Sequence, residues 1–574
     1  MSLLKKKKKP LSGKKLSGSG SGSSEQSPYR PIHMEKKAPC QHACPSGTKI
    51  RDILRTLAQT EDLGRSYHES YKMAFDIILE KNPFPSVCGR VCPHPCEGGC
   101  NRQYKDDSVG INNIERFLGD YALEHEFPVK RLEEDVKDEK IAIIGAGPAG
   151  LSAAYHLALR GYKVDVFEAF SKPGGMLRYG IPDYRLPQDI LDKEINRIEN
   201  LGVNIICNTT IGKDIEYSKL QEDYNAIFVG IGAHKGKLLG VDGEDAPNVW
   251  TGTLFLNKVN SGQKVDIGEK VLVVGGGDTA IDAARIARRL GAEATIVYRR
   301  TRDEMPAIDE EIIGAEEEDV KFHFLAAPIG FVKTGDKVEK MLCQKMELGE
   351  PDASGRRRPV PIEGETFELE CDTVIAAISQ EPEFDGLDHL HEGKDWVKAD
   401  KTGLTEVEKT FAGGDVLDLG LVTIAIFQGR QAAETIHNNF RGITPEPEPD
   451  QPIVEKDQIV FSYYTEKARN ENLHLPPDER IKELSKEIAC TFTEEQVQDE
   501  AARCMSCGMC FDCGTCWSLC QDQVIKKPQQ KYQQYIFKLD LCKGCSKCAE
   551  SCPCGYIEMK NPMTGELQKI EKNP

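Results

Sequence analysis

The chain has 574 residues and a formal net charge of −18. This length exceeds a single hydrophobic core and predicts about three or four domains. The acidic balance gives no support for nucleic-acid binding and suits partners that are basic or are redox proteins. No apolar run approaches the roughly 18–20 residues that cross a bilayer, so we expect no membrane span and a cytoplasmic protein. A homo-oligomer is left open.

The first 30 residues are basic and then rich in Gly and Ser. They lack the apolar stretch of a secretory signal, and they predict a disordered tail over 1–30. The chain holds 21 cysteines, most of them in short-spaced runs towards its two ends. Because no export signal accompanies them, they favour metal ligation in a reducing compartment over disulfides.

Residues 31–130 contain cysteines and amphipathic helical patterns, such as "INNIERFLGDYALEHE". From about residue 138 the pattern becomes apolar strand, glycine turn, helix and strand, and it recurs at 270, which predicts parallel α/β architecture. A Pro/Glu-rich linker with one helix fills 444–500, and a second cysteine-rich block fills 501–574.

The first glycine turn lies in "KIAIIGAGPAGLSAAYHLALRGYKVDVFEA". Gly145 permits the tight turn, Gly147 lets the backbone approach a pyrophosphate, and Gly150 lets the helix pack on the strand. The phosphates would lie at the helix N-terminus, where free N–H groups favour anions. Glu168 ends the second strand and can accept hydrogen bonds from ribose hydroxyls. This pattern favours a dinucleotide site for FAD over the alternative, a glycine turn with a structural role alone.

The unit "KVLVVGGGDTAIDAARIARRLGAEATIVYRR" repeats this pattern, but its second strand ends in Arg299 and Arg300 rather than in an acid. Strict counting brings Tyr298 to the place of Glu168, and one extra turn residue brings Arg299 there. Guanidinium groups can bind a 2′-phosphate that a carboxylate would repel, so the unit predicts NADPH over NADH. The alternative is that both arginines only cover a solvated strand end.

Two such units imply a tightly held flavin and an exchangeable nicotinamide. A late turn, "TFAGGDVLD", could reach the flavin's ribityl and phosphate groups, and the helix after it could face the flavin ring. The sequence indicates no general base. The candidate dinucleotide-binding residues are Gly145, Gly147, Pro148, Ala149, Gly150, Glu168, Gly175, Arg185, Gly275, Gly277, Asp278, Thr279, Ala280, Arg299, Arg300, Gly414 and Asp415.

The stretches "NPFPSVCGRVCPHPCEGGC", "GGMLRYGIPDYRLP", "GGGDTAIDAAR", "VYRRTRDEMPA" and "FAGGDV" resemble the small subunit of glutamate synthase and its relatives over about residues 38–440. The resemblance implies an α/β protein with two Rossmann-like domains. FAD would bind to 138–265 and 380–443, and an inserted NADPH domain would span 266–379. It also implies an N-terminal α-helical domain with two [4Fe–4S] clusters.

The C-terminal block has the spacing of a two-cluster ferredoxin, in which each fourth cysteine ligates the other cluster, and it predicts a ferredoxin-like α+β domain. Zinc is the alternative for any single C-x-x-C pair, but the doubled pattern disfavours it. The expected ligand sets are Cys510, Cys513, Cys516 and Cys552 for one cluster, and Cys520, Cys542, Cys545 and Cys548 for the other.

The N-terminal block has six cysteines, Cys40, Cys44, Cys88, Cys92, Cys96 and Cys100, where two clusters need eight ligands. The family completes one cluster with a carboxylate or carboxamide in the following helix, which here implies Cys44, Cys92, Cys96 and Glu115. Alternatively Glu115 is an ordinary exposed helix residue, and Cys88 is then the rival ligand.

The remaining cluster would have only Cys40 and Cys100. Relatives carry an RC-x-x-C pair just upstream of the first of these, and this chain has none there, yet "AARCMSC" occurs at 501–507. We therefore expect Cys504 and Cys507 to fold back and complete this cluster. Fifteen cysteines and one glutamate would then serve four [4Fe–4S] clusters.

The expected activity is electron transfer between NADP(H), FAD, the clusters and a redox partner protein. With its fused ferredoxin, the chain resembles the iron–sulfur flavoproteins associated with dissimilatory sulfite reductase, which implies a sulfite reductase system as the partner. Two alternatives remain open: a glutamate synthase small subunit with an added ferredoxin, paired with a large subunit, and a non-enzymatic electron carrier with vestigial nucleotide sites.

Overall fold

The computed structural model describes residues 27–353, 355–391, 396–446, 449–570 and 572. Most of the predicted tail, residues 1–26, lies outside this range. The chain forms two compact units. The larger unit comprises 36–456 and 461–508, and the smaller comprises the chain up to Glu35, 457–460 and everything from Met509 onward. No helix of the described chain is long and apolar enough to cross a bilayer.

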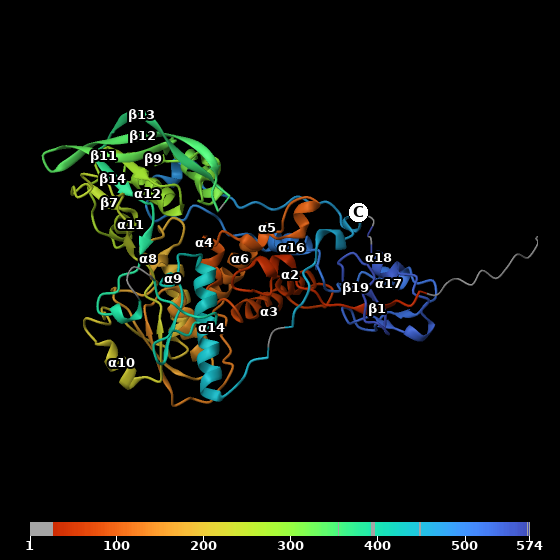
Figure 1. The fold of residues 1–574 in the computed structure, drawn as a ribbon. Helices are drawn as coiled ribbons and strands as arrows, with labels where there is room; N and C mark the ends of the chain where they lie inside the picture. The colour runs from red at the N-terminus through yellow and green to blue at the C-terminus, as the bar shows by residue number, and fades with distance from the viewer. Residues whose placement is uncertain (1–26, 354, 392–395, 447–448, 571, 573–574) are drawn as a thin grey trace, which may run out of the picture. The chain divides into compact units, whose positions relative to one another are not determined.

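The first sheet of the larger unit is five-stranded and parallel, in the order β16-β5-β2-β3-β4 (Figure 1). Its inner strands read as apolar runs because helices cover both faces of such a sheet. Helix α7 (Pro148–Ala158) packs against the long helix α14 (Val422–Arg441). The strands are β2 (Lys140–Ile144), β3 (Lys163–Phe167), β4 (Asn204–Ile206), β5 (Ala226–Val229) and β16 (Thr410–Ala412).

The second sheet, in the order β10-β9-β8-β14-β7, is inserted between β5 and β16 of the first. The outgoing and returning chains pair with each other as β6 (Lys235–Gly236) and β15 (Gln380–Glu381). The inserted region therefore begins well before residue 266, and Trp250 already lies in its edge strand. The strands are β7 (Val249–Thr251), β8 (Lys270–Val274), β9 (Glu293–Tyr298), β10 (Lys321–Phe324) and β14 (Thr373–Ala376).

Helices α11 (Gly252–Asn260) and α12 (Asp278–Arg289) pack against this second sheet. A separate antiparallel sheet contains β11 (Ala326–Thr334), β12 (Lys337–Pro351) and β13 (Arg357–Glu370). The order and direction of the two parallel sheets confirm the predicted α/β class with two Rossmann-like domains.

The N-terminal part of the larger unit is helical. Helix α16, from far along the chain, packs against α2 and α6 (Figure 1), and its Val497 and Ala501 are fully buried with α2 side chains. This segment was expected to be a linker with one helix, and the structure makes it part of a core. The helices are α1 (Pro39–Ala43), α2 (Ile50–Ala58), α3 (Tyr67–Leu79), α4 (Pro85–Val91), α5 (Pro95–Gly98), α6 (Ile111–Glu124) and α16 (Glu494–Ala502).

Helices α4 and α6 approach each other at two glycines. A Cβ added to Gly89 would lie 2.4 Å from the Cα of Arg116, and one added to Gly119 would lie 2.3 Å from the backbone N of Ser86. Glycine at both positions lets the two backbones touch. The contact brings the cysteine-bearing end of α4 next to Glu115 of α6.

We expect Gly89→Ala to lower the free energy of unfolding of the helical part by about 1–3 kcal/mol, because the new methyl group meets backbone atoms that cannot move aside. Chemical denaturation followed by circular dichroism measures this change. Gly98→Ala is the matched control, since a Cβ there has no neighbour within 4 Å. Equal stability of the two variants would contradict the close helix contact.

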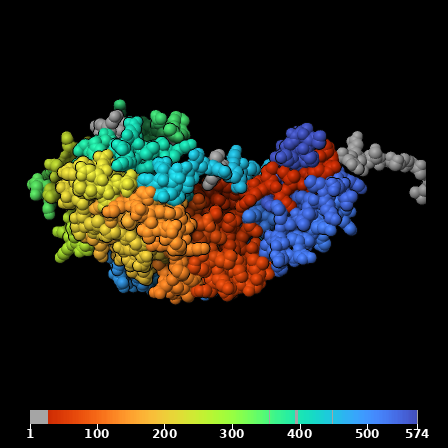
Figure 2. All heavy atoms as spheres, turned by 90° about the horizontal axis from the view of Figure 1, so that it is seen from below, coloured from red at the N-terminus to blue at the C-terminus, as the bar shows by residue number. Residues whose placement is uncertain are grey.

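The smaller unit joins the beginning of the described chain to its C-terminal part. Strand β1 (Arg30–His33) pairs antiparallel with β19 (Ile557–Lys560), so red atoms lie against blue ones in Figure 2. A two-stranded ribbon of β17 (Ile525–Lys526) and β18 (Ile536–Phe537) completes its strands. Two short helices, α17 (Thr515–Ser518) and α18 (Lys547–Glu550), pack against each other.

Candidate functional site: two dinucleotide pockets and four cysteine groups

The first pocket lies at the carboxyl ends of the strands in the first sheet, where ligands bind in open α/β folds. Its cavity measures about 530 Å³, a size typical of cofactor sites. The glycine turn leaves no room for a side chain at two positions: a Cβ on Gly145 (φ +98°) would lie 2.4 Å from the carbonyl O of Gly230, and one on Gly175 would lie 2.8 Å from the Cα of Gly147.

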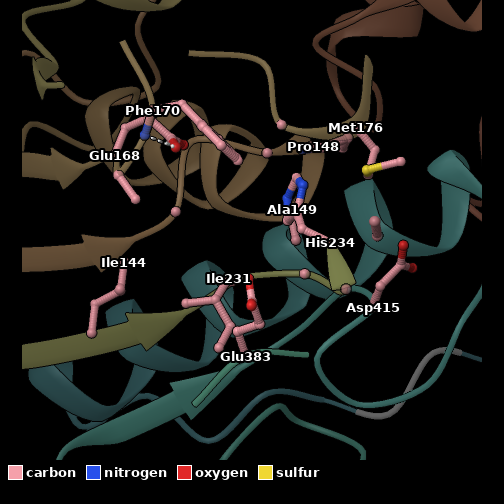
Figure 3. Close-up of a pocket in the computed structure, with 18 of the residues that line it drawn as sticks. Ile144, Pro148, Ala149, Glu168, Phe170, Met176, Ile231, His234, Glu383 and Asp415 are labelled. Atoms are coloured by element: carbon pink, nitrogen blue, oxygen red, sulfur yellow. Dashed lines mark hydrogen bonds between the residues drawn. The ribbon is translucent and has the colours of Figure 1, made fainter. Parts of the chain in front are cut away.

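Glu168 is held at the mouth of this turn. Its carboxylate accepts hydrogen bonds from the backbone N–H of Ala146 at 2.7 Å and of Phe170 at 2.9 Å, the second of which is drawn in Figure 3. Burial raises the pKa of this carboxyl group despite those hydrogen bonds. Each carboxylate oxygen has a second lone pair, so both remain able to accept from a ribose hydroxyl.

Eight predicted residues line this first pocket, and their chemistry fits FAD. Gly150 does not line it, but a Cβ there would lie 2.0 Å from the carbonyl O of Gly145, which explains the glycine by helix–strand contact. Asp415 points into the pocket in Figure 3, and burial raises its pKa to about 6. The eight are Gly145, Gly147, Pro148, Ala149, Glu168, Gly175, Gly414 and Asp415.

His234 was not predicted, yet its imidazole projects into the same pocket (Figure 3). Burial lowers its pKa to about 4, so the ring is neutral near pH 7. The ring packs edge-on against Phe170 with centroids 5.3 Å apart. The only local signal was the Gly-rich run "GIGA" before it, which marks a close backbone approach.

The second pocket lies at the corresponding edge of the second sheet and has a volume of about 850 Å³. Gly275, Gly277, Thr279, Arg299 and Arg300 line it as predicted candidates. The structure keeps strict register between the two units: Gly145 donates to the carbonyl O of Phe167, the residue before Glu168, and Gly275 donates to that of Val297, the residue before Tyr298. Tyr298 is therefore the counterpart of Glu168.

The two arginines differ in their surroundings. Arg300 is buried, and its guanidinium donates to Asp352 at 2.8 Å and to the carbonyl O of Arg357 at 2.6 Å. Arg299 is exposed at the pocket rim. Arg356 of the β12–β13 hairpin also lines the pocket, and no local pattern indicated it because it is more than 50 residues away in sequence.

Besides Gly150, three predicted cofactor residues lie outside both pockets. Arg185 pairs with the buried Asp282 at 2.7 Å, which fixes the segment after α8 (Met176–Tyr179) to α12. Asp278 accepts a hydrogen bond from the backbone N–H of Ile308 at 3.0 Å. Ala280 is fully buried against the glycine turn. All three support the fold around the pockets rather than line them.

Cys40, Cys100, Cys504 and Cys507 surround one small cavity of the larger unit. Burial is the largest cause that raises the pKa of the Cys40 thiol, and the neighbouring thiols of Cys100, Cys504 and Cys507 raise it further. All four sulfurs are therefore close enough to interact electrostatically. Four thiols around one point form a donor set that fits an iron–sulfur cube.

A buried polar network holds the returning segment in place. Arg51 of α2 donates to the carbonyl O of Cys507 at 2.9 Å, and Arg102 donates to that of Arg503 at 3.1 Å. Glu500 accepts from the backbone N–H of Gly110 at 2.8 Å. Buried charged groups persist only when they are paired in this way.

A second group contains Cys44, Cys92, Cys96 and Glu115. The pKa of the Cys96 thiol is raised by burial first and then by the neighbouring Glu97, Cys44, Cys92 and Glu115. Burial likewise raises the pKa of Glu115 to about 7. Cys88 is also close to Glu115, so the structure brings both the predicted ligand and its rival to this group.

Asn82 orients Glu115, which no sequence signal indicated. Its side-chain N–H donates to Glu115 Oε1 at 2.8 Å, while its Oδ1 accepts from the backbone N–H of Phe84 at 2.9 Å. Because the second hydrogen bond fixes the amide orientation, the donor faces the carboxylate. Such supporting hydrogen bonds aim a metal ligand.

We expect Asn82→Ala to lower the affinity for iron of this one group by roughly 10- to 100-fold, because Glu115 loses the donor that aims it. Bleaching of the cluster absorbance by a chelator, resolved by EPR, measures the change. Asn225→Ala is the control, since Asn225 binds only the backbone N–H of Lys140 in the first sheet. Equal bleaching of both variants would remove Asn82 from this role.

The smaller unit brings the ferredoxin cysteines together in two groups. The pKa of the Cys516 thiol is raised by burial first and then by the neighbouring Cys552, Cys513 and Cys510. The pKa of the Cys548 thiol is likewise raised, by burial first and then by the neighbouring Cys542, Cys545 and Cys520. Each fourth cysteine thus lies with the other run, as the crossed ferredoxin pattern requires.

Cys554 also lies beside the first ferredoxin group. Its Sγ is 3.9 Å from that of Cys552, and both line the same cavity. Throughout the described residues, no three His, Cys, Asp or Glu side chains converge closely enough for a single metal ion. A cube is bound at its corners, so its ligands need not converge on one point.

Comparisons with known proteins agree with this geometry. Residues 139–435 match the family described as pyridine nucleotide-disulphide oxidoreductase, and 30–127 match the 4Fe–4S domain II of dihydropyrimidine dehydrogenase. The "NADPH-Fe(3+) oxidoreductase subunit beta" of Geobacter sulfurreducens is 38% identical, over 82% of this chain and 75% of that protein.

Two further relatives match different shares of this chain. The "NADP(+)-dependent formate dehydrogenase subunit beta" of Moorella thermoacetica is 38% identical over 86% of this chain and 74% of that protein. The "Glutamate synthase [NADPH] small chain" of Escherichia coli is 34% identical over 70% of this chain and 88% of that protein. The chain therefore belongs to the pyridine nucleotide-disulphide oxidoreductase family, in the iron–sulfur flavoprotein branch that includes the glutamate synthase small chain.

Proposed function

We propose that this oxidoreductase is the NADPH-binding subunit of a larger redox enzyme, and that it exchanges electrons with a partner protein through four [4Fe–4S] clusters. The observation that carries the proposal is the junction of the two dinucleotide pockets. Gln380 lines both cavities, and Leu419 of the second adjoins Gly420 of the first. A nicotinamide in one pocket would thus lie near a flavin in the other.

The residues around the two pockets would bind and orient the dinucleotides rather than react with them. Glu168 would hold the adenosine ribose of FAD, and the two glycine turns would receive the pyrophosphates. His234 is neutral and buried, so it adds no charge beside the flavin. A bound flavin supplies the step between two-electron hydride chemistry and one-electron transfer.

The four cluster sites follow from the cysteine groups. Fifteen cysteines and Glu115 would ligate them, with Cys504 and Cys507 completing the group of Cys40 and Cys100. Glu115 rather than Cys88 is the favoured ligand, because Asn82 aims its carboxylate. A carboxylate ligand should set the potential of that cluster apart from the others.

For the partner, we propose a sulfite reductase system, on the strength of the fused ferredoxin-like unit. Two relatives that match more than four fifths of this chain are named as β subunits of other enzymes, which supports a partner subunit in general. The alternative is a glutamate synthase small subunit with an added ferredoxin, favoured by the high coverage of the small chain itself.

Purification of the native protein tests the proposal. Bound FAD and NADPH-dependent reduction of a viologen dye are expected, and their absence would leave only a carrier without working nucleotide sites. Co-purification with sulfite reductase subunits, and NADPH-dependent electron delivery to them, is the expected outcome for the partner. A co-purifying amidotransferase subunit with glutamine-dependent activity would replace it with the glutamate synthase assignment.

A further inference from the structure

The smaller unit exposes its two cysteine groups unequally. In the first group Cys516 and Cys552 are buried, at 7% and 6% exposure. In the second group Cys545 is exposed, and Cys520, Cys542 and Cys548 are partly exposed. An electron leaves most readily where a centre comes closest to the surface, so the second group marks the point of exchange.

Large apolar side chains are exposed next to this second group. Leu519 precedes Cys520 and Leu541 precedes Cys542, so both lie within one residue of a cysteine of the group. Leu541 is 64% exposed. Ile536 of β18 and Trp517 of α17 are also exposed, at 61% and 50%. Exposed apolar side chains grouped in this way mark interaction sites.

The same segment is basic within an acidic chain. Between residues 522 and 550 there are six lysines and three acids, Asp522, Asp540 and Glu550, whereas the whole chain carries −18. Lys543 pairs with Asp522 at 3.2 Å. All six lysines are exposed. They are Lys526, Lys527, Lys531, Lys538, Lys543 and Lys547.

Two of these lysines are forced together by the β-ribbon. Lys526 ends β17 opposite Ile536, and Lys538 follows β18, with its backbone N–H bonded to the carbonyl O of Val524. The ammonium of Lys526 lowers the pKa of Lys538, as expected for like charges at close range. An incoming carboxylate would relieve this repulsion.

We propose that the surface formed by Trp517, Leu519, Ile536, Leu541 and the lysines of residues 526–547 is the docking site for a redox protein with an acidic face. The apolar residues would form the buried centre of the contact and the lysines its charged rim. Each NADPH would supply two electrons, which would leave one at a time for the partner's oxidised centre, while the proton of the hydride would be released to solvent as NADP+ forms; no bond would form between the two proteins.

An acidic protein fits this surface better than a lipid bilayer with anionic headgroups. Both would satisfy the lysines, but a headgroup layer has no centre to take an electron from the exposed cysteine group. Away from the basic residues of the first 30 positions, the net negative charge of the chain repels an acidic partner, which favours this surface.

The test uses the full-length holoprotein with cytochrome b5 as an acidic acceptor and cytochrome c as a basic one. We expect the NADPH-dependent reduction of cytochrome b5 to fall roughly 10-fold with rising salt. It should fall similarly in Lys526→Glu/Lys538→Glu. Carbodiimide cross-linking followed by mass spectrometry gives a readout independent of turnover, with links expected at the six lysines.

Lys560→Glu/Lys569→Glu is the matched control, because it makes the same charge change on exposed lysines of the same unit. The inference rests on the proposed function, and viologen reduction by NADPH separates the two. Loss of viologen reduction in the wild type would refute the proposed function. If viologen reduction is intact, any of three results would refute the docking site alone. These are cross-links at other residues, equal behaviour of the two double variants, and binding of phosphatidylserine vesicles but not of cytochrome b5.

Discussion

The double variant Cys504→Ala/Cys507→Ala is expected to lose about one quarter of the iron and acid-labile sulfide of the protein, because one of four clusters would keep only two of its four ligands. Both cysteines lie at the same cavity as Cys40 and Cys100. Iron analysis, sulfide analysis and EPR of the reduced protein measure the loss. The other three cluster signals should persist, since their cysteines lie in separate groups.

A control must separate a missing ligand from general damage. Cys343→Ala/Cys371→Ala removes two other buried thiols, which pack in the core beside the antiparallel sheet of β11–β13. It should keep its full iron content. If the Cys504/Cys507 variant also kept four clusters, the fold-back would be structural only, and the ligands of the cluster at Cys40 would have to be sought elsewhere.

The family, the fold class and the two nucleotide pockets were predictable because their signals are local. A turn such as that at Gly145 needs glycine for the space that a Cβ would fill, and the need is written within a few residues. The same holds for the cysteine runs of the ferredoxin-like unit. Here, spacing along the chain largely determines which side chains meet.

Other features were missed because they depend on contacts between distant residues. Arg185 belongs to a conspicuous motif, but its partner Asp282 lies almost 100 residues away and draws it out of both pockets. The close contact of α4 with α6 depends on two glycines 30 residues apart, and it decides what lies beside Glu115. No pattern within either helix reveals this pairing.

The return of 494–507 to the N-terminal helices lies between these cases. A count of ligands indicated it, because two cysteines were missing at one end and two were spare at the other. The buried Arg503, hydrogen-bonded to the carbonyl O of Asp107 at 2.6 Å, could not be predicted from composition, because its partner lies 396 residues away in the chain. The ligand count predicted that these residues return to the N-terminal helices, which helix periodicity did not indicate; that the two cysteines ligate a cluster stays a prediction.

The strongest test of the nucleotide assignment is Arg299→Ser, for which we expect kcat/KM with NADPH to fall roughly 10- to 100-fold. This is the effect of losing charge-assisted hydrogen bonds to a phosphate, about 1.5–3 kcal/mol. The value with NADH should stay nearly unchanged, because NADH has no 2′-phosphate. Steady-state viologen reduction with each coenzyme measures both.

Arg302→Ser is the matched control, because Arg302 lies three residues away and pairs with Glu316 at 3.1 Å outside the pocket. Arg300→Ser should act differently: it removes the ion pair that ties Asp352 of the β12–β13 hairpin to the end of β9, displaces Arg356 and weakens NADPH binding indirectly. If Arg299→Ser left the NADPH-to-NADH ratio intact while Arg300→Ser lowered it, the hairpin and not the strand end would read the 2′-phosphate. A wild-type preference for NADH would refute both.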